Sequence, residues 1–225
     1  MQNALFNLFF PNLCLGCAII LNDHEITICT QCRHDLPTTN FHFNEPETLK
    51  KVLYGRAKIE DASALFHFDK KGIVQNLLHE LKYKKQEKVS HFLGEWLAMD
   101  LQDSNLFNAI DVVVPVPLHP SKLKKRGFNQ VHGFASALGK RLRARVEKEV
   151  LIKIKSTKSQ VNKNRLERWQ LNNEAFSTKN LQRLNGKHIL LVDDVITTGA
   201  TIEACCNELS KAENVKISVA TMAIA

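Results

Sequence analysis

The stretch from His188 to Thr201 constrains the fold more than any other part of this 225-residue chain. It opens with an apolar run, Ile189 to Val192, whose length suits a buried strand. Two aspartates follow, and then the residues TTGAT, which predict a tight loop. After the loop, apolar residues recur at the spacing of an amphipathic helix. These residues are Ile202, Cys205, Cys206 and Leu209. The stretch therefore predicts a strand, a loop and a helix in succession, with both cysteines buried as small hydrophobic residues.

The acid pair and the loop suit a sugar phosphate. Asp193 and Asp194 carry carboxylates, which only accept hydrogen bonds and so match the vicinal hydroxyls of a ribose. Small residues in the loop let backbone N–H groups at the helix start approach phosphate oxygens. In open α/β sheets, ligands bind beyond the carboxyl ends of the strands, where this loop falls. The alternative without a ligand is an acidic strand end followed by a capped helix.

The ten residues VDDVITTGAT, from 192 to 201, resemble the ribose-phosphate signature of type I phosphoribosyltransferases. Members of that family bind phosphoribosyl diphosphate. The resemblance implies that Asp193 and Asp194 bind the ribose hydroxyls and that the loop binds the 5-phosphate. The implied phosphate-binding residues are Thr197, Thr198, Gly199, Ala200 and Thr201.

Four cysteines near the front of the chain form two CxxC pairs. They are Cys14, Cys17, Cys29 and Cys32. Two such turns can place four thiolates around one tetrahedral Zn²⁺, and closed four-cysteine sites are structural. Residues 1–42 are too few for a core of their own and would need such a metal to fold. A redox role for one CxxC pair is the competing interpretation, whereas a reducing cytoplasm disfavours disulfides.

The positive charge of the chain is concentrated in one region. The net charge is +8, and residues 119–170 contain 15 Lys or Arg against 3 Glu. This concentration favours a polyanionic partner, either diphosphate or nucleic acid or both, over the alternative of a solvated basic surface. No apolar run approaches the roughly 20 residues of a membrane span. The apolar N-terminus has no preceding Lys or Arg and meets Pro11, so we expect no signal peptide and a cytoplasmic protein.

Apolar patterning in the remainder predicts an α/β domain. We expect strands at 63–68, 111–117, 149–155 and 215–225, and helices at 74–81, 89–96 and 134–142. Strands that alternate with helices imply a mostly parallel sheet flanked by helices. The predicted organisation is a zinc knuckle at 1–42, a linker around 43–50, and a phosphoribosyltransferase-like domain at 50–225.

The order of motifs resembles the ComF family over nearly the whole chain. The four-cysteine knuckle is followed by VPVPLHP at 114–120, RGFNQ at 126–130 and then VDDVITTGAT. ComF members include the competence protein ComFC. The resemblance implies a role in natural transformation, in which the protein handles incoming single-stranded DNA beside a helicase-like partner. The alternative is an active phosphoribosyltransferase that moves phosphoribose to an amine or a base.

The same resemblance implies further site residues. It places residues 115–117 at a diphosphate-binding loop and residues 156–168 in a lid, with an exposed helix start as the alternative for the second segment. Lys82 and Tyr83 resemble a Lys-aromatic motif with a phosphate contact. Candidates for the diphosphate loop are Lys124, Lys125, Arg126, Asn129 and Gln130, and candidates for the lid are Gln160, Arg165 and Arg168.

Phosphoribosyl transfer would need Mg²⁺ and basic side chains at the diphosphate and backbone amides at the 5-phosphate. Thr197 stands where hypoxanthine-type transferases carry an aspartate base, and threonine cannot act as a base at neutral pH. The general base is therefore unassigned. For DNA binding, the aromatic residues Phe128, Phe134 and Trp169 could stack on bases, and burial in the core is the alternative.

Overall fold

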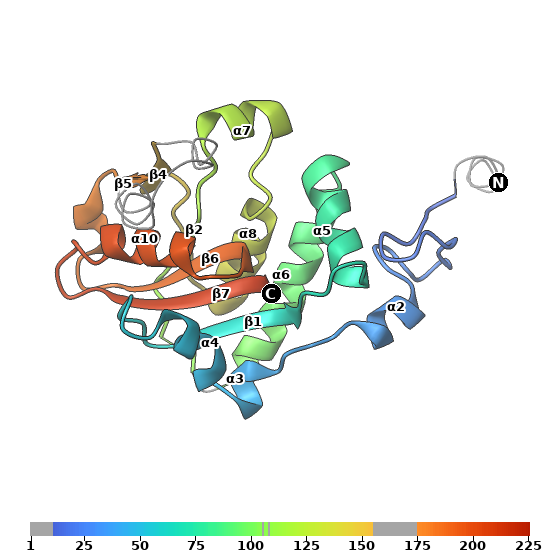
Figure 1. Ribbon diagram of the computed structural model, residues 1–225, viewed down its shortest axis with the longest axis horizontal. Helices are drawn as coiled ribbons and strands as arrows, with labels where there is room; N and C mark the ends of the chain where they lie inside the picture. The colour runs from blue at the N-terminus through green and yellow to red at the C-terminus, as the bar shows by residue number, and fades with distance from the viewer. Residues whose placement is uncertain (1–10, 105, 108, 155–174) are drawn as a thin grey trace.

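A five-stranded parallel sheet forms the centre of the molecule (Figure 1). The computed structural model describes residues 11–104, 106–107, 109–154 and 175–225. The strand order is β1-β7-β6-β2-β3, and all four pairings are parallel. The strands are β1 (Ala62–His67), β2 (Val112–Pro115), β3 (Arg145–Val146), β6 (His188–Ile196) and β7 (Lys216–Ile224). The prediction of a mostly parallel sheet flanked by helices is confirmed.

Helices cover both faces of this sheet because the central strands are apolar on both sides. Along β6, Leu190 and Val192 belong to one buried cluster, while Ile189 and Leu191 belong to the other. The first cluster includes side chains from α5 (Ile73–Tyr83), α6 (Lys88–Asp103) and α8 (His132–Leu142). The second includes side chains from α4 (Glu47–Leu53) and α10 (Ala200–Leu209), and it contains the two buried cysteines of α10. The alternation along β6 thus divides the core into two layers.

Strand β6 is longer than its apolar run. The sequence placed the acid pair just after a strand that ended at Val192, whereas β6 continues to Ile196. The reason is the neighbouring strand β7, which pairs with β6 in register as far as Ile196 and Ile224. Asp193 lies opposite Thr221 within this ladder. The acid pair is therefore part of the sheet.

A small second sheet lies outside the main one. It pairs β4 (Leu151–Lys153) with β5 (Phe176–Thr178) in antiparallel fashion. Leu151 and Phe176 pack into the same cluster as α10. The strand expected at 149–155 therefore forms, but in this two-stranded ribbon. A 3-10 helix, η2 (Leu181–Leu184), then leads the chain back to β6.

The prediction of a linker at residues 43–50 was wrong. After α2 (Thr30–Asp35), the chain pairs with the edge of the sheet, where Thr38 and Phe66 form an antiparallel bridge. It then forms α3 (Phe41–Asn44) and α4. Phe41 and Leu49 are buried in the core cluster that includes α10. Their apolar side chains fold this segment onto the sheet, which explains the helical structure.

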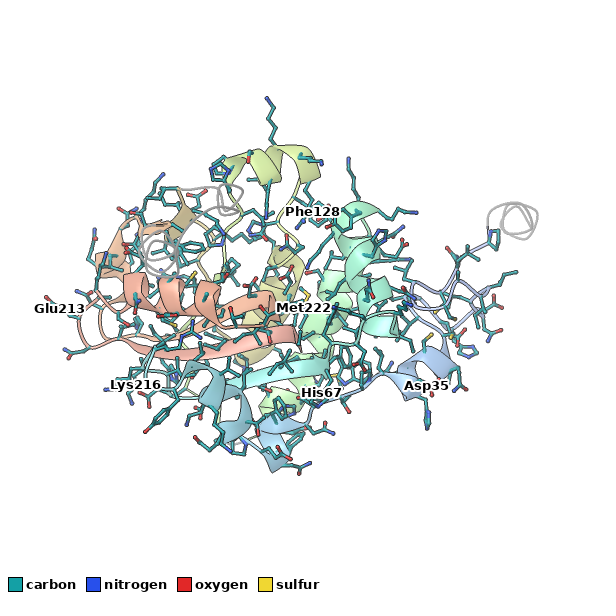
Figure 2. The ribbon with its side chains drawn as sticks, viewed as in Figure 1. Asp35, His67, Phe128, Glu213, Lys216 and Met222 are labelled. Atoms are coloured by element: carbon teal, nitrogen blue, oxygen red, sulfur yellow. The ribbon has the colours of Figure 1, made fainter. Side chains whose placement is uncertain are left out.

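The carboxyl edge of the sheet lies toward α5 and α7 (Pro120–Arg126). Figure 2 labels Lys216 near the start of β7 and Met222 near its end, which gives the direction of the parallel strands. Helix α7 stands away from the sheet and buries none of its residues. In the described part of the chain, no helix combines the length and apolar character needed to span a membrane.

Candidate sugar-phosphate site and cysteine cluster

The acid pair lies near the end of β6 with its carboxylates anchored to the backbone. The Asp194 N–H donates to Oδ1 of Asp193 at 2.8 Å, and the Val195 N–H donates to Oδ1 of Asp194 at 2.7 Å. Asp193 is buried. Burial, with the neighbouring Asp194 carboxylate, raises the pKa of Asp193 to about 7. Near neutral pH its carboxyl is therefore partly protonated, and it can donate as well as accept a hydrogen bond.

Asp194 is paired with two side chains from other segments. Lys82 Nζ, in the last turn of α5, lies 2.6 Å from Oδ2 of Asp194. Gln130 Nε2 donates to the same oxygen at 2.9 Å. Arg126, at the end of α7, donates in turn to Oε1 of Gln130. The structure thus brings the acid pair, the Lys-aromatic motif and part of the RGFNQ motif together.

Asn129 holds the RGFNQ segment against the preceding loop. Its side-chain amide donates to the Val116 carbonyl at 3.0 Å, and its Oδ1 accepts from the Val131 N–H at 3.1 Å. Asn129 and Gln130 are both buried, so they are internal connectors in this structure. The expected role of Asn129 and Gln130 in fixing a diphosphate loop is compatible with these bonds and stays a prediction.

The loop between β6 and α10 carries the expected phosphate-binding residues. Thr197 and Thr198 are exposed, whereas Gly199 is buried. Gly199 has a φ of +75°, and a Cβ at this position would lie 2.8 Å from Cδ2 of Leu53. Only glycine meets both requirements at low cost. The N–H groups at the start of α10, at Ala200 and Thr201, precede the helical ladder and have no intrahelical carbonyl to bind. The loop therefore has the chemistry of an anion site.

Arg56 fixes this loop, although no sequence motif marks it as a site residue. Its Nη1 donates to the Thr198 carbonyl, and its Nε donates to Oε2 of Glu203 at 2.9 Å. Glu203 is buried in the first turn of α10. Arg56 and Glu203 are 147 residues apart in sequence, so no local motif could have signalled the contact.

A second lysine approaches the acid pair from β4. Burial lowers the pKa of Lys153, and the Asp193 carboxylate opposes that effect. Lys153 Nζ also lies 4.8 Å from the centre of the Phe176 ring. In turn, the charges of Lys82 and Lys153 oppose the rise in the Asp193 pKa. Asp193 therefore lies in the electrostatic field of two lysines, one from α5 and one from β4.

The other expected residues are placed as follows. Lys124 and Lys125 are exposed in the last turn of α7. Phe128, labelled in Figure 2, is half-buried and packs against the cluster with α5, α6 and α8. Phe134 is fully buried in that cluster, so it cannot stack on a base. The lid candidates Gln160, Arg165 and Arg168, and also Trp169, lie outside the described residues.

The four cysteines of the knuckle converge. Their Sγ atoms all lie within 4.8 Å of one another, and those of Cys17 and Cys29 are 3.7 Å apart. Four sulfurs around a tetrahedral zinc ion, with Zn–S bonds of about 2.3 Å, would be about 3.8 Å apart. All six cysteines of the chain are free thiols. The cluster could therefore hold a metal ion.

The four thiols differ in how readily they ionise without a metal. Burial raises the pKa of Cys14, but N–H groups of Cys29, Cys17 and Gly16 outweigh it and lower the pKa to about 7. Burial raises the pKa values of Cys29 and Cys32, and the neighbouring sulfurs add to the effect at Cys32. A bound metal would displace the remaining thiol protons.

The knuckle packs directly on α5. The side-chain amide of Asn76 donates to the Gly16 carbonyl at 2.8 Å. A Cβ at Gly16 would lie 2.9 Å from Cγ2 of Ile73 and 2.9 Å from Sγ of Cys32. Because Lys82 near the other end of α5 reaches Asp194, this one helix contacts both sites.

The chain is similar to a phosphoribosyltransferase domain and to proteins whose names refer to competence and DNA utilization. A family model described as "Phosphoribosyl transferase domain" matches residues 123–224. Competence protein F of Haemophilus influenzae is 28% identical over 210 residues, covering 88% of this chain and 82% of that protein. DNA utilization protein YhgH of Escherichia coli K12 is 27% identical over 180 residues, covering 78% of this chain and 74% of that protein. Competence protein ComFC of Bacillus subtilis is 38% identical over 107 residues, covering 46% of this chain and 41% of that protein.

Proposed function

We propose that this chain, which belongs to the ComF family, handles incoming single-stranded DNA in natural transformation and binds phosphoribosyl diphosphate or a related sugar phosphate. The names of its relatives, two competence proteins and a DNA utilization protein, support the first part. The second part depends on one observation, the acid pair of β6 beside the glycine loop at the start of α10. The proposal places the protein in the cytoplasm, with a competence helicase as a partner.

The proposed ligand would span the end of β6. Its ribose hydroxyls would bind Asp193 and Asp194, and its 5-phosphate would bind the amides of the loop from Thr197 to Thr201. Its diphosphate would extend toward Lys82 and Arg126, whose charges suit phosphate oxygens. The acid pair offers the hard oxygen atoms that Mg²⁺ prefers, and Mg²⁺ would neutralise charge on the diphosphate.

Binding is the part of this proposal that the contacts support. The exposed side chain at position 197 is a threonine, which supplies no base for an acceptor. Transfer of phosphoribose to an amine or a base would need that proton to be taken elsewhere. A site of this kind can serve binding alone, because a fold does not determine a function.

In the knuckle, we propose a structural zinc ion held by Cys14, Cys17, Cys29 and Cys32. The convergence of the four Sγ atoms and the 3.7 Å separation of two of them support this assignment. Four thiolates complete a tetrahedral shell, which leaves no position for a substrate. The ion would thus stabilise the fold of the knuckle.

Calorimetric titration with phosphoribosyl diphosphate and Mg²⁺ tests the sugar-phosphate site. We expect wild-type protein to bind, and Asp193→Asn/Asp194→Asn to bind at least about tenfold more weakly, because neutral amides lose the charge-assisted bonds to the ribose. Asp103→Asn, at an exposed position of α6, is the matched control and should bind like wild type. A wild-type protein that fails to bind would rule out the proposed ligand class.

Fluorescence anisotropy with a labelled single-stranded oligonucleotide tests the DNA part. We expect affinity to fall steeply as salt is raised, since each neutralised phosphate releases counterions. A salt slope near zero would contradict an electrostatic interface.

A further inference from the structure

A second basic surface lies beside the loop between β6 and α10, residues 197–201, which we call the phosphate loop. This surface is outside the basic region at residues 119–170. It is a groove of about 720 Å³ between α4 with its following loop and the end of α10, and we call it the α4 groove. Its basic lining residues are Lys50, Lys51, Arg56 and Lys58, and Tyr54 lies among them. Asn207 of α10 and Ser210, the residue after it, also line the groove, and Glu47 is an acidic lining residue. Basic and aromatic side chains thus share one concave surface.

Two of these cations are available for a ligand. Lys50 pairs with Glu47 at 2.8 Å, and Arg56 is neutralised by Glu203. Lys51 and Lys58 are exposed, and within the described ranges neither pairs with a carboxylate. The groove therefore presents two ammonium groups without an internal counter-charge, which favours an anionic ligand.

Tyr54 distinguishes the groove from an ordinary basic surface. It is 88% exposed and follows α4 directly. An aromatic ring that faces solvent in the same groove as two exposed lysines can stack on a base while the lysines bind phosphates. An acidic peptide would bind the two lysines through its carboxylates and would not need the aromatic ring.

The α4 groove is joined to the sugar-phosphate site by Arg56. This residue lines the groove, and it also donates to the Thr198 carbonyl in the phosphate loop. We propose that the α4 groove binds single-stranded nucleic acid, with a base on Tyr54, phosphates at Lys51 and Lys58, and the neighbouring nucleotide at the phosphate loop. This inference depends on the proposed function, because it extends the same ligand from one site to the next.

Charge reversal in the full-length protein tests the electrostatic half of this inference. Anisotropy with a labelled single-stranded oligonucleotide should show affinity at least about tenfold weaker for Lys51→Glu/Lys58→Glu than for wild type. The slope of log affinity against log salt should be smaller in magnitude than that of wild type by about 1.4. This difference corresponds to the loss of two phosphate contacts at about 0.7 each on a single strand. Lys70→Glu/Lys71→Glu carries the same change in charge at an exposed turn before α5 and should retain most of the affinity.

Substitution of Tyr54 tests the stacking half. Tyr54→Ala should weaken oligonucleotide binding by at least about fivefold, while Tyr54→Phe should bind like wild type, since the ring is what stacks. An oligonucleotide with 5-iodouracil should crosslink to Tyr54 under ultraviolet light. Because the side chain is exposed, none of these changes should disturb folding, and thermal melting serves as the check.

The outcomes separate this inference from the proposed function. If wild-type protein and all α4 groove variants bind the oligonucleotide equally, the groove assignment is wrong and the general DNA proposal stands. If both charge-reversed pairs lose affinity equally, binding follows net charge, and the groove assignment is again wrong. If the wild type binds no oligonucleotide, the DNA part of the proposed function fails, and this inference fails with it. Selective loss in the groove variants supports the inference.

Discussion

Different interactions stabilise the cysteine knuckle and the five-stranded sheet. Among residues 11–36 of the knuckle, half of the buried apolar residues are the cysteines Cys14, Cys29 and Cys32, while Ile19, Ile20 and Ile26 are exposed. In the sheet, β6 alone contributes four fully buried aliphatic side chains to two core clusters. Small segments bury too little apolar surface to fold alone and depend on metals or disulfides. The buried residues of the knuckle join the apolar cluster around α5 and α6, and the proposed zinc ion would add to this small share of the core.

Removal of the metal should separate the two regions most clearly. We expect Cys17→Ser to lose bound zinc and the fold of residues 11–36, because three ligands hold zinc far more weakly than four. Cys17 is exposed, so its replacement removes little packing. Metal analysis and limited proteolysis would measure the loss, and thermal melting should still show the transition of the sheet. Equal loss of structure in both regions would instead show that they fold as one unit.

A cavity in the sheet should have the converse effect. Leu191 is fully buried in β6, and we expect Leu191→Ala to lower the free energy of unfolding by about 2–5 kcal/mol. Leu123→Ala, on exposed α7, is the same chemical change and should cost far less. Denaturant titration measures both. Zinc content should be unchanged in folded Leu191→Ala. A reduced zinc content would contradict separate stabilisation of the knuckle and the sheet.

The left-handed glycine of the phosphate loop should tolerate little change. We expect Gly199→Ala to lower the free energy of unfolding by about 2 kcal/mol, from the positive φ and from contact with Leu53. Gly186→Ala is a matched control, because Gly186 has a φ of +67° with open space around its Cβ position. It should cost about 1 kcal/mol. If the two variants were equally stable, crowding by Leu53 would contribute nothing.

The acid pair should make the sheet region sensitive to pH. The folded protein raises the pKa of Asp193 from 3.8 to about 7. It therefore holds this proton more tightly than the unfolded chain does, and the free energy of unfolding falls as pH rises from about 4 to about 7. Asn cannot ionise, so Asp193→Asn should gain stability relative to wild type, by at least about 1 kcal/mol more at pH 8 than at pH 4. Denaturant titrations at both pH values measure this, and a gain independent of pH would count against a raised pKa.

The smallest expected effect lies at the contact between the regions. Asn76→Ala removes the hydrogen bond from α5 to the Gly16 carbonyl and should cost about 1 kcal/mol. Differential hydrogen exchange should locate the change in the knuckle and the first turns of α5. Exchange that is altered only in distant strands would contradict a local contact.

The sequence predicted those features that depend on local pattern. Apolar runs and helical spacing led to the strands and helices of a parallel sheet, and the cysteine spacing led to a cluster that the structure forms. Features that depend on distant partners were missed. The contact between Arg56 and Glu203 joins residues 147 apart in sequence, and the contact between Gln130 and Asp194 joins residues 64 apart. The segment at 43–50 was predicted as a linker, but Phe41 just before it and Leu49 within it anchor it to the core.

The length of β6 has a consequence for the speed of recognition. Because the ladder with β7 runs past the acid pair to Ile196, the backbone amides there should exchange with deuterium only when the sheet itself opens. Association is slower when binding requires a conformational change, whereas a backbone built into a strand is in place before the ligand arrives. The backbone at Asp193 and Asp194 should therefore impose no delay on the proposed ligand, which still has to displace Lys82 and Gln130 from the Asp194 carboxylate.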